Sequence, residues 1–134
     1  MRVSVIIPTH NEAQAIARVL ADLPSDLITE VIVVDSNSND GTPEIAARIG
    51  ARVIQEPRRG YGRACLTGLA TANSPDIVVF LDGDYSDRPS ELPILLGPII
   101  QGDAISRSAL ASASSAFRRR CHGIRRSETA SQPA

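Results

Sequence analysis

The sequence contains no lysine and no tryptophan, and aromatic residues make up only 3% of it. Without lysine, the phosphate-binding loop of P-loop ATPases is excluded, and no G-x-G-x-x-G follows the first apolar segment, which argues against a dinucleotide-dependent oxidoreductase. The two cysteines, Cys65 and Cys121, fit no metal-binding spacing and predict free thiols. No signal peptide is recognised, and no apolar run reaches the roughly 20 residues that cross a bilayer. We therefore expect a cytoplasmic chain without a membrane span.

Charge divides the chain into two parts. The formal net charge of −1 gives no reason to expect nucleic acid as a partner. Residues 1–102 hold eight arginines against thirteen acidic residues, whereas residues 103–134 hold six arginines against two. We predict one globular part over 1–102 and a basic Ser/Ala/Arg-rich tail over 103–134.

Apolar segments alternate with segments of helical periodicity along the first part. Short β-branched runs predict strands at 3–7, 31–34, 52–55 and 77–81. Helices are predicted at 12–23, at 42–49 with Thr42 as the cap, at 63–72, and from 89 to about 102. This alternation indicates an α/β fold in which a mostly parallel sheet is covered by helices on both faces.

The unusual polar residues follow the predicted strands, at 8–12, 35–40 and 82–87. In parallel sheets ligands bind beyond the carboxyl ends of the strands. Asp82 and Asp84 lie one residue apart in a loop, where both carboxylates can face one Mg²⁺ or Mn²⁺ that shares its remaining positions with phosphate. The alternative for this pair is a solvated turn.

Three further segments carry polar groups with more than one interpretation. Asp35 begins an acceptor-rich loop that suits a base or a ribose, although Asp40 and Thr42 could equally cap the next helix. Glu12 could favour a helix N-terminus, and His10 is expected to be a loop residue. The loop at 58–63, Arg-Arg-Gly-Tyr-Gly-Arg, could reach diphosphate oxygens or could be an ordinary surface loop.

Four segments in register resemble the family 2 glycosyltransferases with the GT-A fold, and most of all their polyprenyl-phosphate (dolichyl-phosphate) branch. They are VSVIIPTHNEAQAI, VIVVDSNSNDGT, RRGYGRACLTGLATA and DIVVFLDGDYSDRPSELP. The resemblance implies a divalent metal, Mg²⁺ or Mn²⁺, bound by Asp82 and Asp84. It also implies substrate contacts from Pro8, Thr9, Asn11, Glu12, Asp35, Arg63 and Asp82. Arg63 stands where the family often has lysine, and Ser86 stands where that branch often has glutamine.

The reaction implied by the resemblance is sugar transfer from a nucleoside diphosphate sugar to an acceptor, with the metal stabilising the departing diphosphate. The acceptor of that branch is a polyprenyl phosphate, which would bring the full-length protein to the inner face of the membrane. No catalytic base is identified. Two alternatives stay open: a non-catalytic nucleotide-binding remnant and a sugar-1-phosphate nucleotidyltransferase, although the latter should carry a Gly-rich loop after the first strand.

The tail departs from the family. Residues 105–126 show no sustained period, which predicts a disordered basic segment. In the frame that starts at the third base of the Ala104 codon, however, residues 104–111 allow Asp-Phe-Ala-Val-Gly-Ser-Arg, and residues 120–129 allow Pro-Trp-His-Gln-x-Phe-Gly-Asn. Both resemble family segments in the family's order. We therefore expect that a base was lost near codon 104, that the acceptor-binding half is missing, and that this chain has little transferase activity; the alternative is a native tail.

Overall fold

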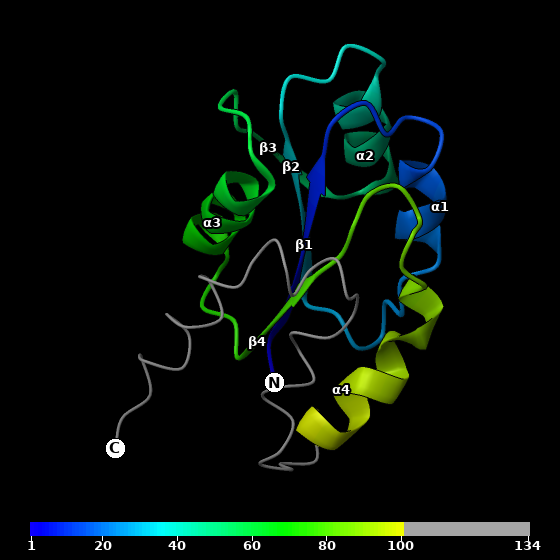
Figure 1. Ribbon diagram of the computed structural model, residues 1–134. Helices are drawn as coiled ribbons and strands as arrows, with labels where there is room; N and C mark the ends of the chain where they lie inside the picture. Colours follow the sequence, from blue (N-terminus) through cyan, green and yellow to red (C-terminus); the bar gives the residue numbers. More distant parts are fainter. Residues whose placement is uncertain (101–134) are drawn as a thin grey trace.

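The computed structural model describes residues 1–100, which form a parallel sheet with helices on both faces (Figure 1). The predictions for the tail, residues 103–134, lie outside the described residues. No helix within residues 1–100 has the length and apolar character needed to cross a membrane. The elements run in the order β1 (Val3–Thr9), α1 (Ile16–Ala21), β2 (Glu30–Asp35), α2 (Thr42–Ile49), β3 (Arg52–Gln55), α3 (Tyr61–Thr71), β4 (Ile77–Phe80), the 3-10 turn η1 (Pro89–Glu91) and α4 (Leu92–Ile100).

The sheet has the strand order β3-β2-β1-β4, and every pair is parallel. The chain builds outward from β1 through β2 to β3, then returns across the sheet to place β4 on the other side of β1. The order therefore reverses at β1. In open α/β sheets a reversal of this kind leaves a crevice at the carboxyl ends of the strands. The register sets Thr9 beside Asp35 at this edge.

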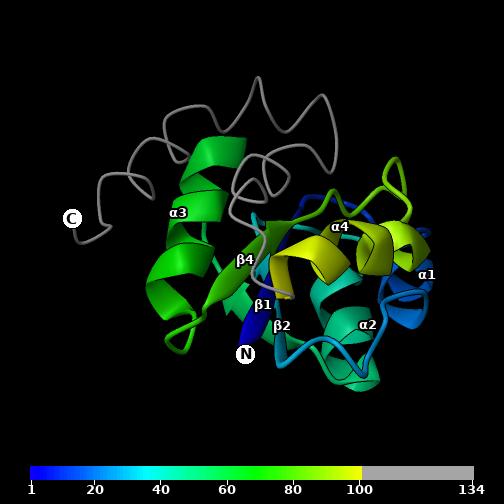
Figure 2. The same cartoon turned by 90° about the horizontal axis from the view of Figure 1, so that it is seen from below.

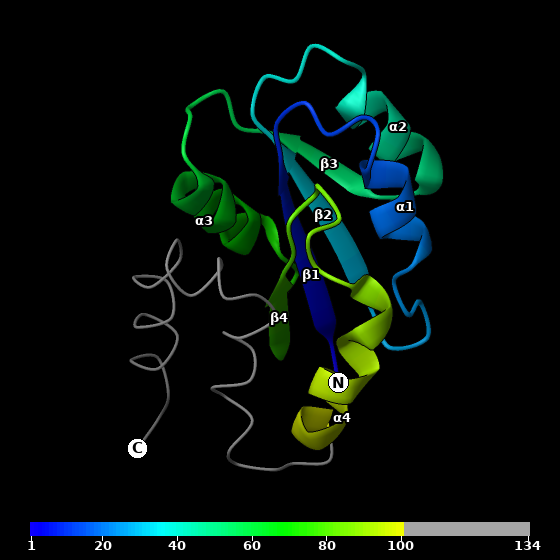
Figure 3. The same cartoon turned by 45° about the vertical axis from the view of Figure 1, so that its right-hand side comes forward.

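Helices α1, α2 and α4 cover one face of the sheet and α3 covers the other (Figures 2 and 3). Side chains of a strand alternate between its two faces. Val5 and Ile7 of β1 accordingly belong to the cluster under α1, α2 and α4, whereas Ile6 belongs to the cluster under α3. Both faces of β1 are covered, and all seven of its residues are buried. This burial explains why apolar residues of β1 face both sides of the sheet instead of alternating with polar ones throughout.

Helix α3 lies unusually close to the sheet at Gly68. A Cβ atom at this position would stand 2.4 Å from Cγ2 of Ile6 and 3.2 Å from Cγ2 of Val34. Carbon atoms in normal contact are separated by about 3.5–4.0 Å. The absence of a side chain at residue 68 therefore fixes how closely α3 packs, and with it the position of the loop that enters the helix.

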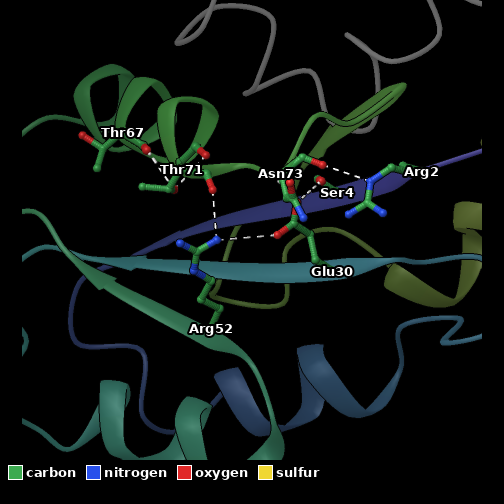
Figure 4. Close-up of polar contacts among 8 residues, drawn as sticks. Arg2, Ser4, Glu30, Arg52, Thr67, Thr71 and Asn73 are labelled. Carbon is green, nitrogen blue, oxygen red and sulfur yellow. Dashed lines mark hydrogen bonds and ion pairs between the residues drawn. The ribbon is translucent and has the colours of Figure 1, made fainter.

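A polar network closes the amino-terminal end of the sheet (Figure 4). The Glu30 carboxylate accepts hydrogen bonds from Ser4 Oγ at 2.6 Å and from the Asn73 backbone N–H at 2.7 Å, and Arg52 lies 3.9 Å away. Arg52 also donates to the carbonyl oxygen of Thr71. Burial disfavours ionisation of Glu30, but these donors outweigh it, so its pKa lies below the ordinary value. The network ties β1, β2, β3 and the end of α3 together.

The predicted α/β class and the parallel sheet are confirmed, and the predicted bounds of 42–49 and 52–55 match α2 and β3. Two local predictions were wrong. The first helix begins at Ile16 rather than near residue 12, because a turn at residues 13–15 precedes it. Thr42 is not the cap of α2: Gly41, with φ of 91°, occupies that position, and the Thr42 hydroxyl instead accepts a hydrogen bond from the backbone N–H of Glu12.

Candidate functional site

A cleft of about 240 Å³ opens at the carboxyl edge of the sheet. Its walls come from the segments that follow β1, β2, β3 and β4, so it lies at the crevice where the strand order reverses. The lining residues are Pro8, Thr9, His10, Glu12, Ser36, Arg59, Gly60, Tyr61, Ala64, Asp82, Gly83 and Asp84. The cleft therefore combines carboxylates from two segments with the cationic side chain of Arg59 and the start of helix α3.

The loop after β4 presents two carboxylates to the cleft. Asp82 is buried, with 8% of its surface exposed, and Asp84 is exposed. Ser86 connects them, because its hydroxyl donates to Asp82 Oδ2 at 3.1 Å and its backbone N–H donates to Asp84 Oδ1 at 2.9 Å. The backbone N–H of Asp82 donates to Asp87. These bonds hold both acidic side chains at one turn of the chain.

Gly83 and Tyr85 fix where this loop sits. A Cβ atom on Gly83 would stand 2.9 Å from Cγ2 of Thr9, so only glycine allows the loop to lie this close to the end of β1. Tyr85 has a positive φ of 65° and its hydroxyl donates to Asp22. The guanidinium of Arg18 covers its ring at 4.1 Å. Helix α1 thus anchors the carboxylate loop from the side.

Glu12 shares the cleft with these carboxylates. Its pKa is raised, first by partial burial and then by the negative charges of Asp84, Asp40 and Asp82. The negative potential at this end of the cleft is the environment that a divalent cation neutralises. Asp82 and Asp84 supply the hard oxygen donors that Mg²⁺ and Mn²⁺ prefer. Within residues 1–100 no group of three or more His, Cys, Asp or Glu side chains is arranged to hold a metal ion.

Asp35 ends β2 and is fully buried. Its Oδ1 accepts hydrogen bonds from Thr9 Oγ1 at 2.8 Å and from Ser38 Oγ at 2.5 Å, and its Oδ2 accepts the Ser38 backbone N–H at 3.0 Å. Ser38 in turn accepts the backbone N–H of Asn11. The carboxylate therefore joins the ends of β1 and β2 to the loop that follows, and it does not reach the cleft.

The basic segment at 58–63, which runs into the first turn of α3, contributes one of its three arginines to the cleft. Arg59 lines it, whereas Arg58 and Arg63 do not. Arg58 is bound to Glu56, which is buried at the end of β3 and also accepts from Thr67 of α3. The hydrogen bonds from Arg58 and Thr67 lower the pKa of Glu56 to about 2.

The predicted site residues divide into two groups. Pro8, Thr9, Glu12, Asp82 and Asp84 line one cleft, as expected from their places after the strands. The three that do not line it are Asn11, Asp35 and Arg63.

The sequence of residues 4–130 matches the model of glycosyl transferase family 2. The chain belongs to this family. The membership confirms the resemblance and decides against a sugar-1-phosphate nucleotidyltransferase. The boundary expected at residue 102 stays a prediction.

Relatives in the family extend well beyond the matched region. The chain is 41% identical over 100 residues to an uncharacterised glycosyltransferase of Mycobacterium tuberculosis, which covers 75% of this chain and 44% of that protein. It is also 39% identical over 114 residues to a dolichyl-phosphate hexose transferase of Haloferax volcanii. This match covers 79% of this chain and 49% of that protein. The chain thus spans less than half the length of these relatives.

A solved structure shows the same fold around a nucleotide. The crystal structure of glucosyl-3-phosphoglycerate synthase from Mycobacterium tuberculosis, in complex with Mn²⁺, UDP and glucosyl-3-phosphoglycerate, superposes with a TM-score of 0.65 at 36% identity. The match covers 76% of this chain and 40% of that one. The GT-A-like architecture expected from the sequence is therefore confirmed.

Proposed function

We propose that this chain forms the nucleotide-sugar-binding part of a glycosyltransferase that moves a sugar from a nucleoside diphosphate sugar to an acceptor. The observation that carries the proposal is the cleft itself, which brings Asp82 and Asp84 together with Arg59 and the start of α3. The carboxylates suit a divalent cation, and the arginine and helix N-terminus suit phosphate. A uridine nucleotide is the first choice of donor, because the synthase with this fold is solved with UDP and Mn²⁺.

The residues of the cleft have separate roles in this proposal. Asp82 and Asp84 hold Mg²⁺ or Mn²⁺, which when bound neutralises charge on the departing diphosphate. Pro8, Thr9 and Glu12 form the wall toward the nucleotide. Asp35 and Asn11 do not line the cleft. Both are hydrogen-bonded to Ser38 and thereby position the loop after β2. Arg63, which the resemblance implied as a substrate contact, lies on the first turn of α3 outside the cleft and has no contact role in this proposal.

For the acceptor we propose a phosphorylated molecule, with polyprenyl phosphate first. One relative is named a dolichyl-phosphate hexose transferase, and another, solved with phosphoglyceric acid, is a glucosyl-3-phosphoglycerate synthase. The two relatives are 39% and 38% identical to this chain, so identity alone does not favour one acceptor over the other. A polyprenyl phosphate would place the reaction at the cytoplasmic face of a membrane. Transfer from radiolabelled UDP-glucose, measured in parallel with the lipid phosphate and with 3-phosphoglycerate, distinguishes these acceptors.

Because we expect the 134-residue chain to turn over little donor, nucleotide binding is the first measurement. Calorimetric titration with UDP should show binding in the presence of Mn²⁺ that EDTA weakens strongly. Asp84→Asn should reproduce the loss, since the amide oxygen can still accept the Ser86 N–H but the charge is gone. Asp26→Asn changes an exposed aspartate between α1 and β2 that does not line the cleft; it is the matched control and should bind like the unmodified protein. UDP binding that is indifferent to EDTA and to Asp84→Asn would rule out the proposed metal site.

A further inference from the structure

Two neighbouring arginines in the loop before α3 have different surroundings. The guanidinium of Arg58 makes two hydrogen bonds to Glu56, at 3.1 and 2.8 Å, in an ion pair whose acidic partner is 4% exposed. Arg59 makes no ion pair within the part of the chain that the structure describes, and it lines the cleft. Arg58 is therefore committed to holding the loop, and Arg59 keeps its charge available to a ligand.

His10 determines where the Arg59 side chain lies. Arg59 Nη2 is 2.9 Å from His10 Nε2, and His10 Nδ1 is 2.5 Å from the carbonyl oxygen of Ser36. A guanidinium can only donate and a carbonyl can only accept. The imidazole must therefore carry its proton on Nδ1 and accept from Arg59 through Nε2. Both contacts specify one neutral tautomer, in which His10 links the end of β1, the start of the loop after β2 and the arginine.

The start of α3 completes an anion-binding arrangement beside this arginine. Gly60 is the N-cap of the helix, with φ of 126°, and both Gly60 and Tyr61 line the cleft. Helix α3 has 11 residues, and the first backbone N–H groups of a helix favour negatively charged ligands. The cleft is thus surrounded by a guanidinium, a helix N-terminus and the two carboxylates proposed to bind metal. This set matches a diphosphate, which carries negative charge along its length and also binds a cation.

We propose that Arg59, positioned by His10, is the residue of this chain that contacts the diphosphate of the donor. The inference rests on the proposed function and adds to it which of the three arginines contacts the ligand. Arg58 stabilises the loop through Glu56. Arg63, which stands where the family often has lysine, lies on the first turn of α3 outside the cleft. His10 is a positioning residue rather than a catalytic one.

The test compares UDP with uridine, which lacks the phosphates, in the presence of Mn²⁺. Calorimetry measures the affinity for UDP, and NMR titration measures that for uridine. Arg59→Gln should weaken UDP binding about tenfold or more, the effect expected for a lost charge-assisted hydrogen bond, and should leave uridine unchanged. Arg63→Gln is the matched control at the family position and should change UDP affinity less than threefold, on the order of the scatter of single surface substitutions.

His10 variants separate positioning from a general structural role. His10→Ala should weaken UDP binding by roughly threefold to tenfold, because Arg59 loses its acceptor. His10→Gln, whose side-chain oxygen can accept from Arg59, should restore most of the affinity. Thermal melts check that each variant is folded.

The possible outcomes are distinct. If the unmodified chain binds no UDP, the proposed function fails and the inference fails with it. If the chain binds UDP and Arg59→Gln binds equally well, or Arg63→Gln carries the larger loss, the assignment of Arg59 is wrong while the proposed function stands. Equal losses in His10→Gln and His10→Ala would overturn the positioning role of His10.

Discussion

Replacing Asp35 by asparagine tests whether this residue is a structural acceptor or a direct ligand of the nucleotide. The carboxylate accepts three hydrogen bonds while fully buried. An asparagine of the same shape keeps only one accepting oxygen. If the amide nitrogen faces the Ser38 N–H, that donor is left without an acceptor. If the amide is turned round, the hydroxyl protons of Thr9 and Ser38 lose theirs.

Either orientation leaves a buried donor unsatisfied and removes the charge from the hydrogen bonds. An unsatisfied buried group costs about 1–3 kcal/mol, so we expect Asp35→Asn to lower the free energy of unfolding by about 2 kcal/mol. With a urea m-value of about 1.5 kcal/mol per M, the midpoint falls by roughly 1.3 M. Urea titration followed by circular dichroism measures this shift directly.

Asp40→Asn is the matched control in the same loop. Asp40 also accepts three hydrogen bonds, two from Thr42 and one from the Ala13 N–H, but it is exposed, so water can replace the lost acceptor. We expect a much smaller shift of the urea midpoint than for Asp35→Asn. If Asp35→Asn keeps the midpoint of the unmodified chain and yet abolishes UDP binding, Asp35 contacts the nucleotide directly and the structural interpretation is wrong.

Three further predictions concern packing, pH and the carboxylate loop. Gly68→Ala should destabilise the fold by about 1–2 kcal/mol, because overpacking against Ile6 exceeds the gain in helix propensity. In a double-mutant cycle measured by urea unfolding, the same substitution should cost less when Ile6 is already alanine. The folded-state pKa of Glu56, about 2, lies below its ordinary value of 4.5, so the ionised carboxylate contributes fully to stability above about pH 4.5 and this contribution is lost as the pH falls toward 2. Glu56→Gln should therefore flatten the dependence of the unfolding free energy on pH in this range. An unchanged pH dependence would contradict the lowered pKa. Tyr85→Phe removes the donor to Asp22 and should weaken the Mn²⁺-dependent affinity for UDP. Unaltered metal dependence would show that α1 does not position the loop.

The backbone of the site could be predicted from the sequence, whereas the direction of its side chains could not. Strand ends are local features, since a β-branched run followed by polar residues defines the edge at Thr9, Asp35 and Asp82. Which side chain then enters the cleft depends on contacts between segments far apart in the chain.

The loop before α3 shows this limit clearly. The resemblance singled out Arg63, whereas Arg58 and Arg59 are equivalent as sequence and only the positions of Glu56 and His10 distinguish them. Asp35 begins an acceptor-rich loop and was expected to contact a base or a ribose. In the fold its carboxylate accepts hydrogen bonds from Thr9 and Ser38, the first of which is 26 residues away. Pattern alone cannot foresee such pairings.

The strand order has a consequence for synthesis of the chain. Strand β1 is made first, yet one of its two edges pairs with β4, whose Ile77 stands opposite Val3. At about 5–20 residues per second, the ribosome needs several seconds between these two strands. Throughout that interval β1, all of whose residues are buried in the folded sheet, has an unpaired edge, which is the kind of surface that recruits other chains. Conditions that slow translation between residues 36 and 80 should therefore lower the yield of soluble protein more than conditions that slow it before residue 30.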